Sequence, residues 1–168
     1  MNLIIVGAAP CVFDDLLEVM NFVNGFDYDL MAIGLDAVCN VPNRIKYMTT
    51  YHPEDIFPAK ERREKFGGNI DYKVISHLAE PGVDIIEPLP DLAGSSALLG
   101  VFAARNLGYS KIILCGCPMQ GINANTHAYE TFQPGWTAQF PKICNYVRSM
   151  SGWTRTLLGE PTEEWLNE

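Results

Sequence analysis

Residues 94–119 carry the pattern that most constrains how this chain folds. Small residues come first, with Ser95 at the position of a helix N-cap, and an apolar run at helical spacing follows. Gly108 occupies the place of a left-handed residue that ends a helix, and a buried strand is expected to follow and to end at Gly116. The first N–H groups of a helix lack partners and favour anions. We therefore expect an anion pocket formed by the backbone of residues 94–97.

Short apolar runs that end at small or polar residues recur along the rest of the chain, and helical spacing separates several of them. Further strands are expected over 2–6, 28–33, 45–50, 72–75 and 83–87, and further helices over 12–23, 54–66 and 137–149. Buried strands that alternate with helices indicate a parallel sheet covered on both faces. We expect a single Rossmann-like α/β domain over residues 1–168, with a mostly parallel sheet flanked by helices and a ligand crevice beyond the carboxyl ends of the strands.

The C-terminal segment 151–168 is expected to be an ordered tail that packs on the domain or on a neighbouring subunit. Ser151 and Thr162 can cap two short helices, and Trp153 and Trp165 can face inward. The pattern favours a packing element over a flexible extension. It is compatible with a homo-oligomer in which the tail packs on a second subunit.

The charge balance narrows the choice of partners. Lys and Arg number 12 against 20 Asp and Glu, for a net charge of −8, whereas nucleic-acid binding needs clustered basic side chains. The basic cluster at 60–65 alternates with glutamates and predicts a solvated helix face. Five cysteines lack disulfide spacing, no leader peptide is expected, and no apolar run reaches the roughly 20 residues that span a bilayer. We expect a reducing, cytoplasmic setting and a protein that binds neither nucleic acid nor membrane.

The residues directly after the expected strands are the candidates for a ligand site. The segment 7–10 can hold an anion or form a plain tight turn, and it lacks the G-x-G-x-x-G pattern of dinucleotide binding. An acid at position 36 can hold a ribose hydroxyl or a metal, although we assign no metal site and no particular cofactor. The ligand-binding candidates are Gly7, Ala8, Pro10, Asp36, His77, Gly94, Ser95, Ser96, Gly116 and Met119, and the proton-transfer candidates are His127 and His52.

The three histidines, His52, His77 and His127, are candidates because an imidazole can exchange protons near neutral pH or clamp a phosphate. For each of them, a loop histidine bonded to the backbone is the structural alternative. The spacing H-E-x-x-H does not occur, which excludes a zinc protease of that type.

Two pairs of residues have simpler structural interpretations. Asp14 and Asp15 fall in the first turn of an expected helix, where carboxylates stabilise the positive end. Cys115 and Cys117 lie on or just past an expected strand, so both side chains should point to one face and act as small core residues.

The segment 94–119 resembles the second nucleotide-binding motif of a Rossmann-like family that includes bacterial CMP-sialic-acid sialyltransferases and 6-hydroxymethylpterin diphosphokinase-like proteins. The residues that carry the resemblance are Ser95-Ser96, Ala103-Ala104, Leu107-Gly108-Tyr109, Lys111-Ile112 and Gly116, together with Gly7 and Pro10 in the first loop. His127 and Tyr129 lie in the interval where the sialyltransferases place a catalytic histidine and tyrosine. The chain departs from the family pattern at Ala8, Ala9, Cys11, Ser96 and Pro118, and Pro118 stands where the family has an aspartate.

The resemblance implies a protein that binds the phosphate of a nucleotide or nucleotide sugar, with glycosyl or phosphoryl transfer, including diphosphoryl transfer, as the reaction class. The expected partner is then a small-molecule nucleotide or nucleotide sugar. The departures from the family pattern favour an alternative, which is a non-catalytic protein of the same fold that binds a protein partner or a small ligand.

Overall fold

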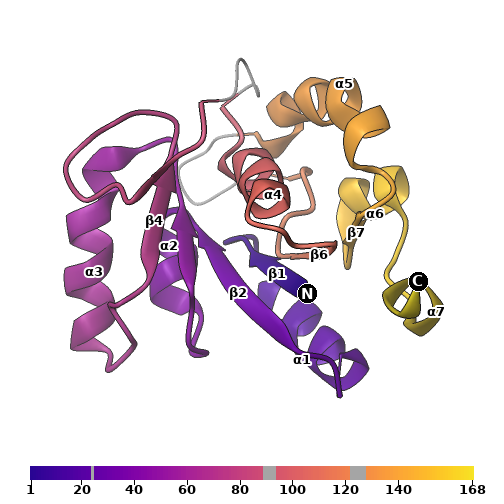
Figure 1. Ribbon diagram of the computed structural model, residues 1–168, viewed down its shortest axis with the longest axis horizontal. Coiled ribbons are helices and arrows are strands. Elements are labelled where there is room, and N and C mark those ends of the chain that lie inside the picture. The colour runs from indigo at the N-terminus through magenta and orange to yellow at the C-terminus, as the bar shows by residue number, and fades with distance from the viewer. Residues whose placement is uncertain (24, 89–93, 122–127) are drawn as a thin grey trace.

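The computed structural model describes residues 1–23, 25–88, 94–121 and 128–168, and within them it forms one seven-stranded sheet. The strands are β1 (Asn2–Val6), β2 (Tyr28–Ile33), β3 (Tyr47–Thr49), β4 (Lys73–Ser76), β5 (Ile85–Ile86), β6 (Lys111–Cys115) and β7 (Val147–Ser149). Their order is β5-β4-β3-β2-β1-β6-β7, and each of these neighbouring pairs is parallel (Figure 1). The predicted α/β fold with its parallel sheet is confirmed.

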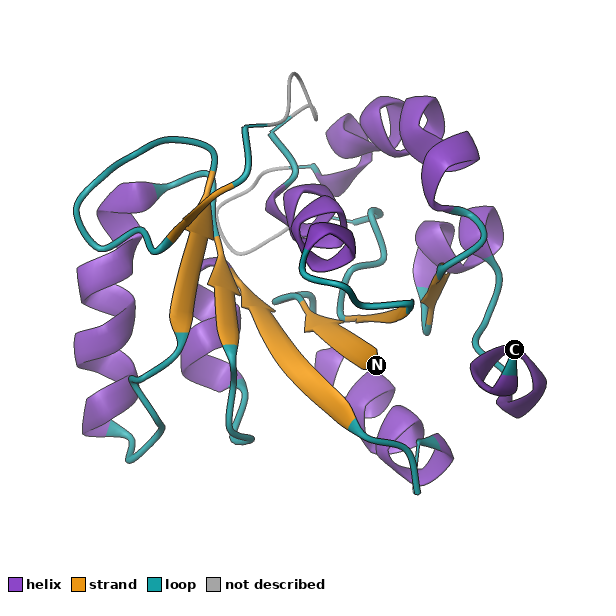
Figure 2. Cartoon of the chain, viewed as in Figure 1, coloured by secondary structure: helices purple, strands orange, loops and turns teal. Residues whose placement is uncertain are grey.

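Helices cover both faces of the sheet, which Figure 2 shows as a central layer of strands. One face packs against α1 (Val12–Phe22), α2 (Gly34–Asn40), α3 (Ile56–Lys65) and α7 (Glu163–Asn167), and the other packs against α4 (Ser96–Asn106), α5 (Gln133–Ile143) and α6 (Gly152–Leu158). Successive strand residues divide between the two layers, since Ile4 packs with the first group and Leu3 and Ile5 with the second. Both layers are apolar, as expected for a sheet that is buried on both faces.

The order of the strands reverses between β1 and β6. After β1 the chain adds β2 to β5 on one side, and it then returns to place β6 on the other side of β1. Ligands of open parallel sheets bind at such a reversal, outside the carboxyl ends of the two strands.

Glycine makes the close approach at this reversal possible. The amide of Gly7 donates to the carbonyl oxygen of Cys115 at 2.8 Å. A Cβ on Gly7 would lie 2.2 Å from the carbonyl oxygen of Gly116, which is far inside van der Waals contact. Gly116 itself has a φ of +63°, the left-handed region that a glycine adopts without strain. The two loops therefore pack backbone to backbone.

The predicted boundaries were wrong for the helix and the strand that follow β6 in the chain. The helix expected over 137–149 is α5, which begins at Gln133 and ends at Ile143, and the next residues include the strand β7. Pro134 in the first turn of α5 is the helix-start signal that sequence reasoning overlooked. The strand has three residues and pairs with β6, so its own sequence carries too little periodicity to reveal it.

Three expected helix ends can be compared directly with the structure. Ser95 caps α4 by accepting a hydrogen bond from the amide of Leu98 at 3.3 Å, and Thr162 caps α7 by accepting from Trp165 at 3.1 Å. Both predictions are confirmed. Ser151 stands at the N-cap position of α6, but its hydroxyl makes no capping bond and donates instead to Asp15.

The tail 151–168 packs on the sheet as expected. Trp165 is buried against the layer of α1, α2 and α3, and the cations of Lys111 and Arg148 lie 4.8 and 5.1 Å from the centroid of its ring. None of the helices in the described ranges is long and apolar enough to cross a bilayer.

The prediction that the two cysteine side chains share a face was wrong. Cys115 packs in the layer of α1, α2 and α3, whereas Cys117 packs in the layer of α4, α5 and α6. The left-handed turn at Gly116 takes the chain out of strand geometry, so the alternation of the strand does not extend to Cys117. Both cysteines are buried, as expected of small core residues.

Candidate functional site

A pocket of about 180 Å³ lies at the reversal between β1 and β6, and we call it the switch-point pocket. Its described lining is Gly7, Ala8, Ile33, His52, Gly94, Ser95, Ser96, Ala97, Gly116, Cys117, Pro118, Met119, Tyr129 and Phe132. These residues come from the end of β2, from the loops after β1, β3 and β6, from the start of α4 and from the short 3-10 helix η2 (Tyr129–Phe132). The predicted candidates that the structure brings together here are Gly7, Ala8, His52, Gly94, Ser95, Ser96, Gly116 and Met119.

The first turn of α4 presents hydrogen-bond donors to the switch-point pocket. The amides of Ser96 and Ala97 are at the first two helical positions, where no intrahelical acceptor exists, and no acceptor for them occurs in the described part of the chain. The Ser95 oxygen accepts from Leu98 and, at 3.2 Å, from the indole N–H of Trp136. The Ser96 oxygen accepts from the amide of Tyr51 at 3.0 Å. Both oxygens are held as acceptors, so each hydroxyl can still donate its own proton to a ligand.

The loop after β6 forms the opposite wall and is held in an uncommon conformation. Met119 has a φ of +49°, a left-handed value that residues other than glycine rarely adopt. The side-chain amide of Gln133 donates to the carbonyl oxygen of Met119 at 2.8 Å, and the amide of Thr154 donates to the carbonyl oxygen of Pro118 at 3.2 Å. Strain of this kind persists where surrounding contacts fix it, and it often marks functional loops.

Asp15 anchors that loop from behind. Its side chain is 5% exposed, and one carboxylate oxygen accepts from the amide of Gly116 and from the hydroxyl of Ser151, both at 2.7 Å. The interpretation of Asp15 as a simple partner of the helix dipole missed this role. A signal was present, since Asp15 falls among Val12 and Leu16 on the buried side of α1, where a charged residue needs a partner.

The cysteines near the site are poor nucleophiles. Burial is the main cause that raises the pKa of the Cys117 thiol, and the nearby Cys11 and Asp15 raise it further. Burial also raises the pKa of Cys11, whose sulfur lies 3.3 Å from the hydroxyl oxygen of Ser151. Thiols that stay protonated do not attack substrates.

Among the described lining residues of the switch-point pocket, none is a lysine, arginine, aspartate or glutamate. His52 is exposed at the mouth, and its Nδ1 lies 3.2 Å from a carboxylate oxygen of Glu54. Burial raises the pKa of Tyr129, with smaller contributions from Cys117 and Asp36, so its hydroxyl stays neutral. No group of three metal-ligating side chains occurs in the described ranges. The pocket can therefore hold a ligand through amides and hydroxyls, with His52 as a proton carrier.

Three of the remaining four candidates do not line this pocket. Pro10 is exposed in the turn before α1, and Asp36 is exposed in the first turn of α2. His77 lines a neighbouring groove, and His127 lies outside the described residues. Tyr129 of η2 was noted through the family resemblance. Ala97 belongs to the anion pocket expected over 94–97, and the lining residues outside the predicted candidates are Ile33, Cys117, Pro118 and Phe132.

A larger groove of about 630 Å³ lies at the opposite edge of the sheet, and we call it the amino-end groove. Its lining is Tyr28, Asp29, Leu30, Asn43, Arg44, Ile45, Lys46, Tyr47, Asp71 and Lys73. Several of its charges bind one another. Lys46 lies 2.7 Å from a carboxylate oxygen of Asp29, and the same oxygen accepts the hydroxyl proton of the buried Tyr109.

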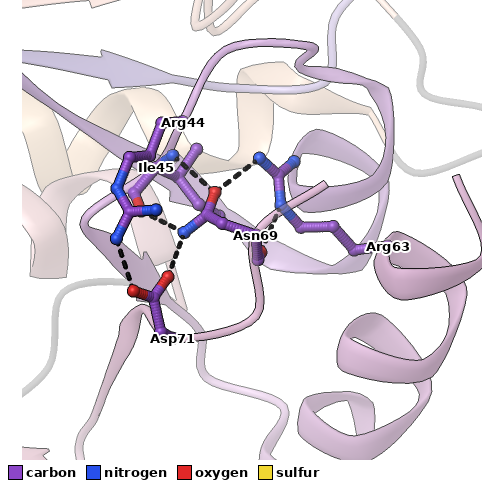
Figure 3. A network of polar contacts seen from close by, with 5 residues as sticks. All are labelled: Arg44, Ile45, Arg63, Asn69 and Asp71. Carbon is purple, nitrogen blue, oxygen red and sulfur yellow. Dashed lines mark hydrogen bonds and ion pairs between the residues drawn. The ribbon is translucent and has the colours of Figure 1, made fainter. Parts of the chain in front are cut away.

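The base of the amino-end groove is a network centred on Asn69 (Figure 3). The Asn69 amide bonds to the backbone N–H and C=O of Ile45 and to the side chains of Arg63 and Asp71, and Arg44 pairs with Asp71. Arg63 is 2% exposed and also donates to four backbone carbonyl oxygens, those of Val38, Val41, Asn43 and Asn69. The prediction of a fully solvated face at 60–65 was thus wrong for Arg63, which joins α3 to the end of α2.

The chain matches no protein-family model, no curated protein and no solved structure.

Proposed function

We propose that this protein binds the phosphate of a nucleotide or nucleotide sugar in the switch-point pocket. The observation that carries the proposal is the convergence, at the start of α4, of donors that have no acceptor among the described residues, namely the amides of Ser96 and Ala97 and the hydroxyls of Ser95 and Ser96. They face the place where parallel α/β sheets bind ligands. The positive end of α4 favours a negative group there.

Because the described lining has no lysine or arginine, the proposed phosphate site is made of neutral hydrogen-bond donors. Backbone amides and hydroxyls hold it without a counter-charge, so binding depends on geometry more than on net charge. A ligand seated there would reach His52 at the mouth, which makes glycosyl or phosphoryl transfer the reaction class if the protein is an enzyme. His127 is the competing proton-transfer residue.

A second candidate function is non-catalytic binding of a small ligand or a protein partner by the same fold. The observation that favours it is the lining itself, in which no described residue is a carboxylate and Pro118 follows β6 where the resembling family has an aspartate. Such a protein would bind its ligand without turnover.

A thermal-shift panel of nucleotides, nucleotide sugars and pterins tests the proposal, since a ligand that binds the native state raises the melting temperature. Ser95→Asp keeps an N-cap oxygen but adds a negative charge, and Ser95→Asn is the neutral control of similar shape. We expect the melting-temperature shift to survive in Ser95→Asn and to disappear in Ser95→Asp. Equal binding by both variants would place the phosphate elsewhere.

Turnover separates the two candidate functions. If the protein is a transferase, His52→Asn or His127→Asn should lower the rate by about two to four orders of magnitude, the range for a lost general acid or base. Ligand binding with no turnover in the wild type would support the non-catalytic function.

A further inference from the structure

A second cavity, of about 510 Å³, lies on the other side of the loop after β3, and we call it the aromatic groove. Its lining residue Tyr51 donates its backbone amide to the hydroxyl oxygen of Ser96, which lines the switch-point pocket. Its lining is Tyr51, Pro53, Glu54, Phe57, His77, Leu78, Glu80 and Pro81. His52 lines the switch-point pocket, while its neighbours Tyr51 and Pro53 line the aromatic groove. One short loop after β3 therefore separates the two cavities, and a ligand of two parts can occupy both.

The aromatic groove offers flat apolar surfaces to a ligand. The rings of Tyr51 and His77 are in contact, with their centroids 4.6 Å apart and their planes tilted by 42°. Two large apolar side chains of the lining are also exposed, Phe57 at 60% and Leu78 at 51%. Aromatic surfaces of this kind bind planar heterocycles by stacking.

The charges of the aromatic groove restrict what the heterocycle can be. Glu54 and Glu80 both line it, and no lysine or arginine does among the described residues. The pKa of Glu54 is lowered chiefly by a hydrogen bond from the backbone and further by His52, so its carboxylate is ionised. Two carboxylates repel a phosphate but accept hydrogen bonds from ring N–H and amino groups.

We propose that the aromatic groove binds a planar heterocycle with N–H or amino donors, the nucleobase of the nucleotide whose phosphate occupies the switch-point pocket. The inference rests on the proposed function for the phosphate end of the ligand. It adds an orientation, in which the base stacks beside Tyr51, His77 and Phe57 and the phosphate reaches the start of α4. His52 then lies between the base and the phosphate.

The experiment is isothermal titration of the full chain with three sets of probes: ribose 5-phosphate, the four 5′-ribonucleotides AMP, CMP, GMP and UMP, and the four corresponding nucleosides. The test variant is Phe57→Ala, whose exposed side chain is dispensable for the core. Its control is Phe66→Ala, which removes an equally large and 74% exposed ring at the other end of α3, outside the aromatic groove. Glu80→Gln tests the hydrogen bonds to the base.

We expect at least one nucleotide to bind about tenfold more tightly than ribose 5-phosphate, the gain typical of one stacked base. Phe57→Ala should abolish that gain and leave ribose 5-phosphate binding unchanged, and Phe66→Ala should keep it. Glu80→Gln should weaken the preferred nucleotide severalfold. The inference is overturned if every nucleotide binds like ribose 5-phosphate, or if Phe57→Ala and Phe66→Ala behave alike.

The probes also separate this inference from the proposed function. If ribose 5-phosphate binds, fails to bind Ser95→Asp and gains nothing from a base, the proposed function stands and the inference fails. If nucleosides bind in a manner that depends on Phe57 while a phosphate adds nothing, the inference stands and the phosphate proposal fails. If no probe binds, both fail. A dimer in sedimentation that Phe57→Ala converts to a monomer would show that a second copy of the chain covers the groove, and this also overturns the inference.

Discussion

The two edges of the sheet differ in how their polar groups are used. At the amino-end groove four of the five charged lining side chains bind one another, in the contacts of Asp29 with Lys46 and of Arg44 with Asp71. At the switch-point pocket no described lining residue is a lysine, arginine, aspartate or glutamate, and the amides of Ser96 and Ala97 have no acceptor in the described part of the chain. The amino-end groove has the larger volume, about 630 Å³ against about 180 Å³.

Under the proposed function, the ligand site is neither the larger nor the more charged of these two cavities. A charge that is paired within the protein has little left to offer a ligand, and an exposed pair contributes little to stability. A donor that the fold leaves without a partner can bind a ligand at low cost, because it loses no existing bond. We therefore expect changes at the carboxyl edge to alter both ligand binding and stability, and changes at the amino edge to alter stability alone.

The largest expected effect is that of Gly7→Ala at the carboxyl edge. The new Cβ would lie 2.2 Å from the carbonyl oxygen of Gly116 and 2.7 Å from the sulfur of Cys117, so the two loops must separate. We expect a loss of about 3 kcal/mol in the free energy of unfolding, measured in urea, and loss of ligand binding. The control is Gly67→Asn, at the end of α3, where a Cβ meets nothing within 4 Å and asparagine tolerates the left-handed backbone. A Gly7→Ala protein that binds its ligand normally would contradict the assignment of the switch-point pocket.

Asp15→Ala should have the next largest effect. It leaves the buried amide of Gly116 and the hydroxyl of Ser151 without their acceptor, which costs about 2 kcal/mol. Asp14, exposed in the same helical turn, provides the matched control, and Asp14→Ala should cost only a few tenths of a kcal/mol, or ~0.3, through the helix dipole. Denaturant titration of both variants measures the difference. Equal losses would show that the contacts of Asp15 with the loop are unimportant.

Two buried tyrosines provide a smaller effect at the amino edge. Tyr109 donates its hydroxyl to Asp29, whereas the hydroxyl of Tyr72 has no partner in the described part of the chain. Tyr109→Phe should therefore lower the free energy of unfolding by about 1.5 kcal/mol near pH 7, and Tyr72→Phe should leave it unchanged. Neither variant should alter ligand affinity. A weaker affinity in Tyr109→Phe would contradict the purely structural role of this edge.

Tyr72 and Tyr109 should also affect how the stability of the protein depends on pH. Burial raises the pKa of Tyr72 to about 12, and burial followed by the bond to Asp29 raises the pKa of Tyr109 further. A tyrosine hydroxyl in the unfolded chain has a pKa of about 10, so it ionises there at a lower pH than in the folded protein. The free energy of unfolding is therefore unaffected by this ionisation below about pH 10 and falls as the pH rises above it. The free energy of unfolding should be measured between roughly pH 9 and pH 11, on either side of the pKa in the unfolded chain. It should fall less steeply with pH in each Phe variant than in the wild type. An unchanged slope in Tyr72→Phe would show that its hydroxyl ionises normally in the folded protein.

Much of the carboxyl edge was predictable from the sequence because its signals are local. Gly7, Ser95 and Gly116 each follow or open a periodic segment, and parallel strands bring their carboxyl ends to one edge. Eight of the predicted site residues line one pocket for this reason. The fold was predictable on the same basis, since the apolar runs correspond to the strands of a parallel sheet.

The features that were missed depend on contacts between distant segments. Asp15 meets Gly116 and Ser151, which are more than a hundred residues away along the chain. The strand β7 is recognisable by its pairing with β6, and Phe132 joins the pocket because α5 begins at Gln133. A periodic pattern describes the segment that carries it and not the partner that the segment meets, so a single sequence could not supply these contacts.

The smallest expected effect is that of Arg44→Ala, and it tests the comparison most directly. Arg44 pairs with Asp71 in the network of Figure 3, and the two side chains are 72% and 61% exposed. An exposed pair of this kind contributes about 0.5 kcal/mol or less, so a double-mutant cycle with Asp71→Ala should give a coupling energy within that limit. Arg44 also lines the larger cavity, and a cation there would be the first choice for a phosphate if volume and charge located the site. We expect nucleotide affinity to be the same in Arg44→Ala and in the wild type, measured by titration at low salt, where a contribution from this charge would be greatest. A clear loss of affinity would move the anion site to the amino edge and reverse the comparison.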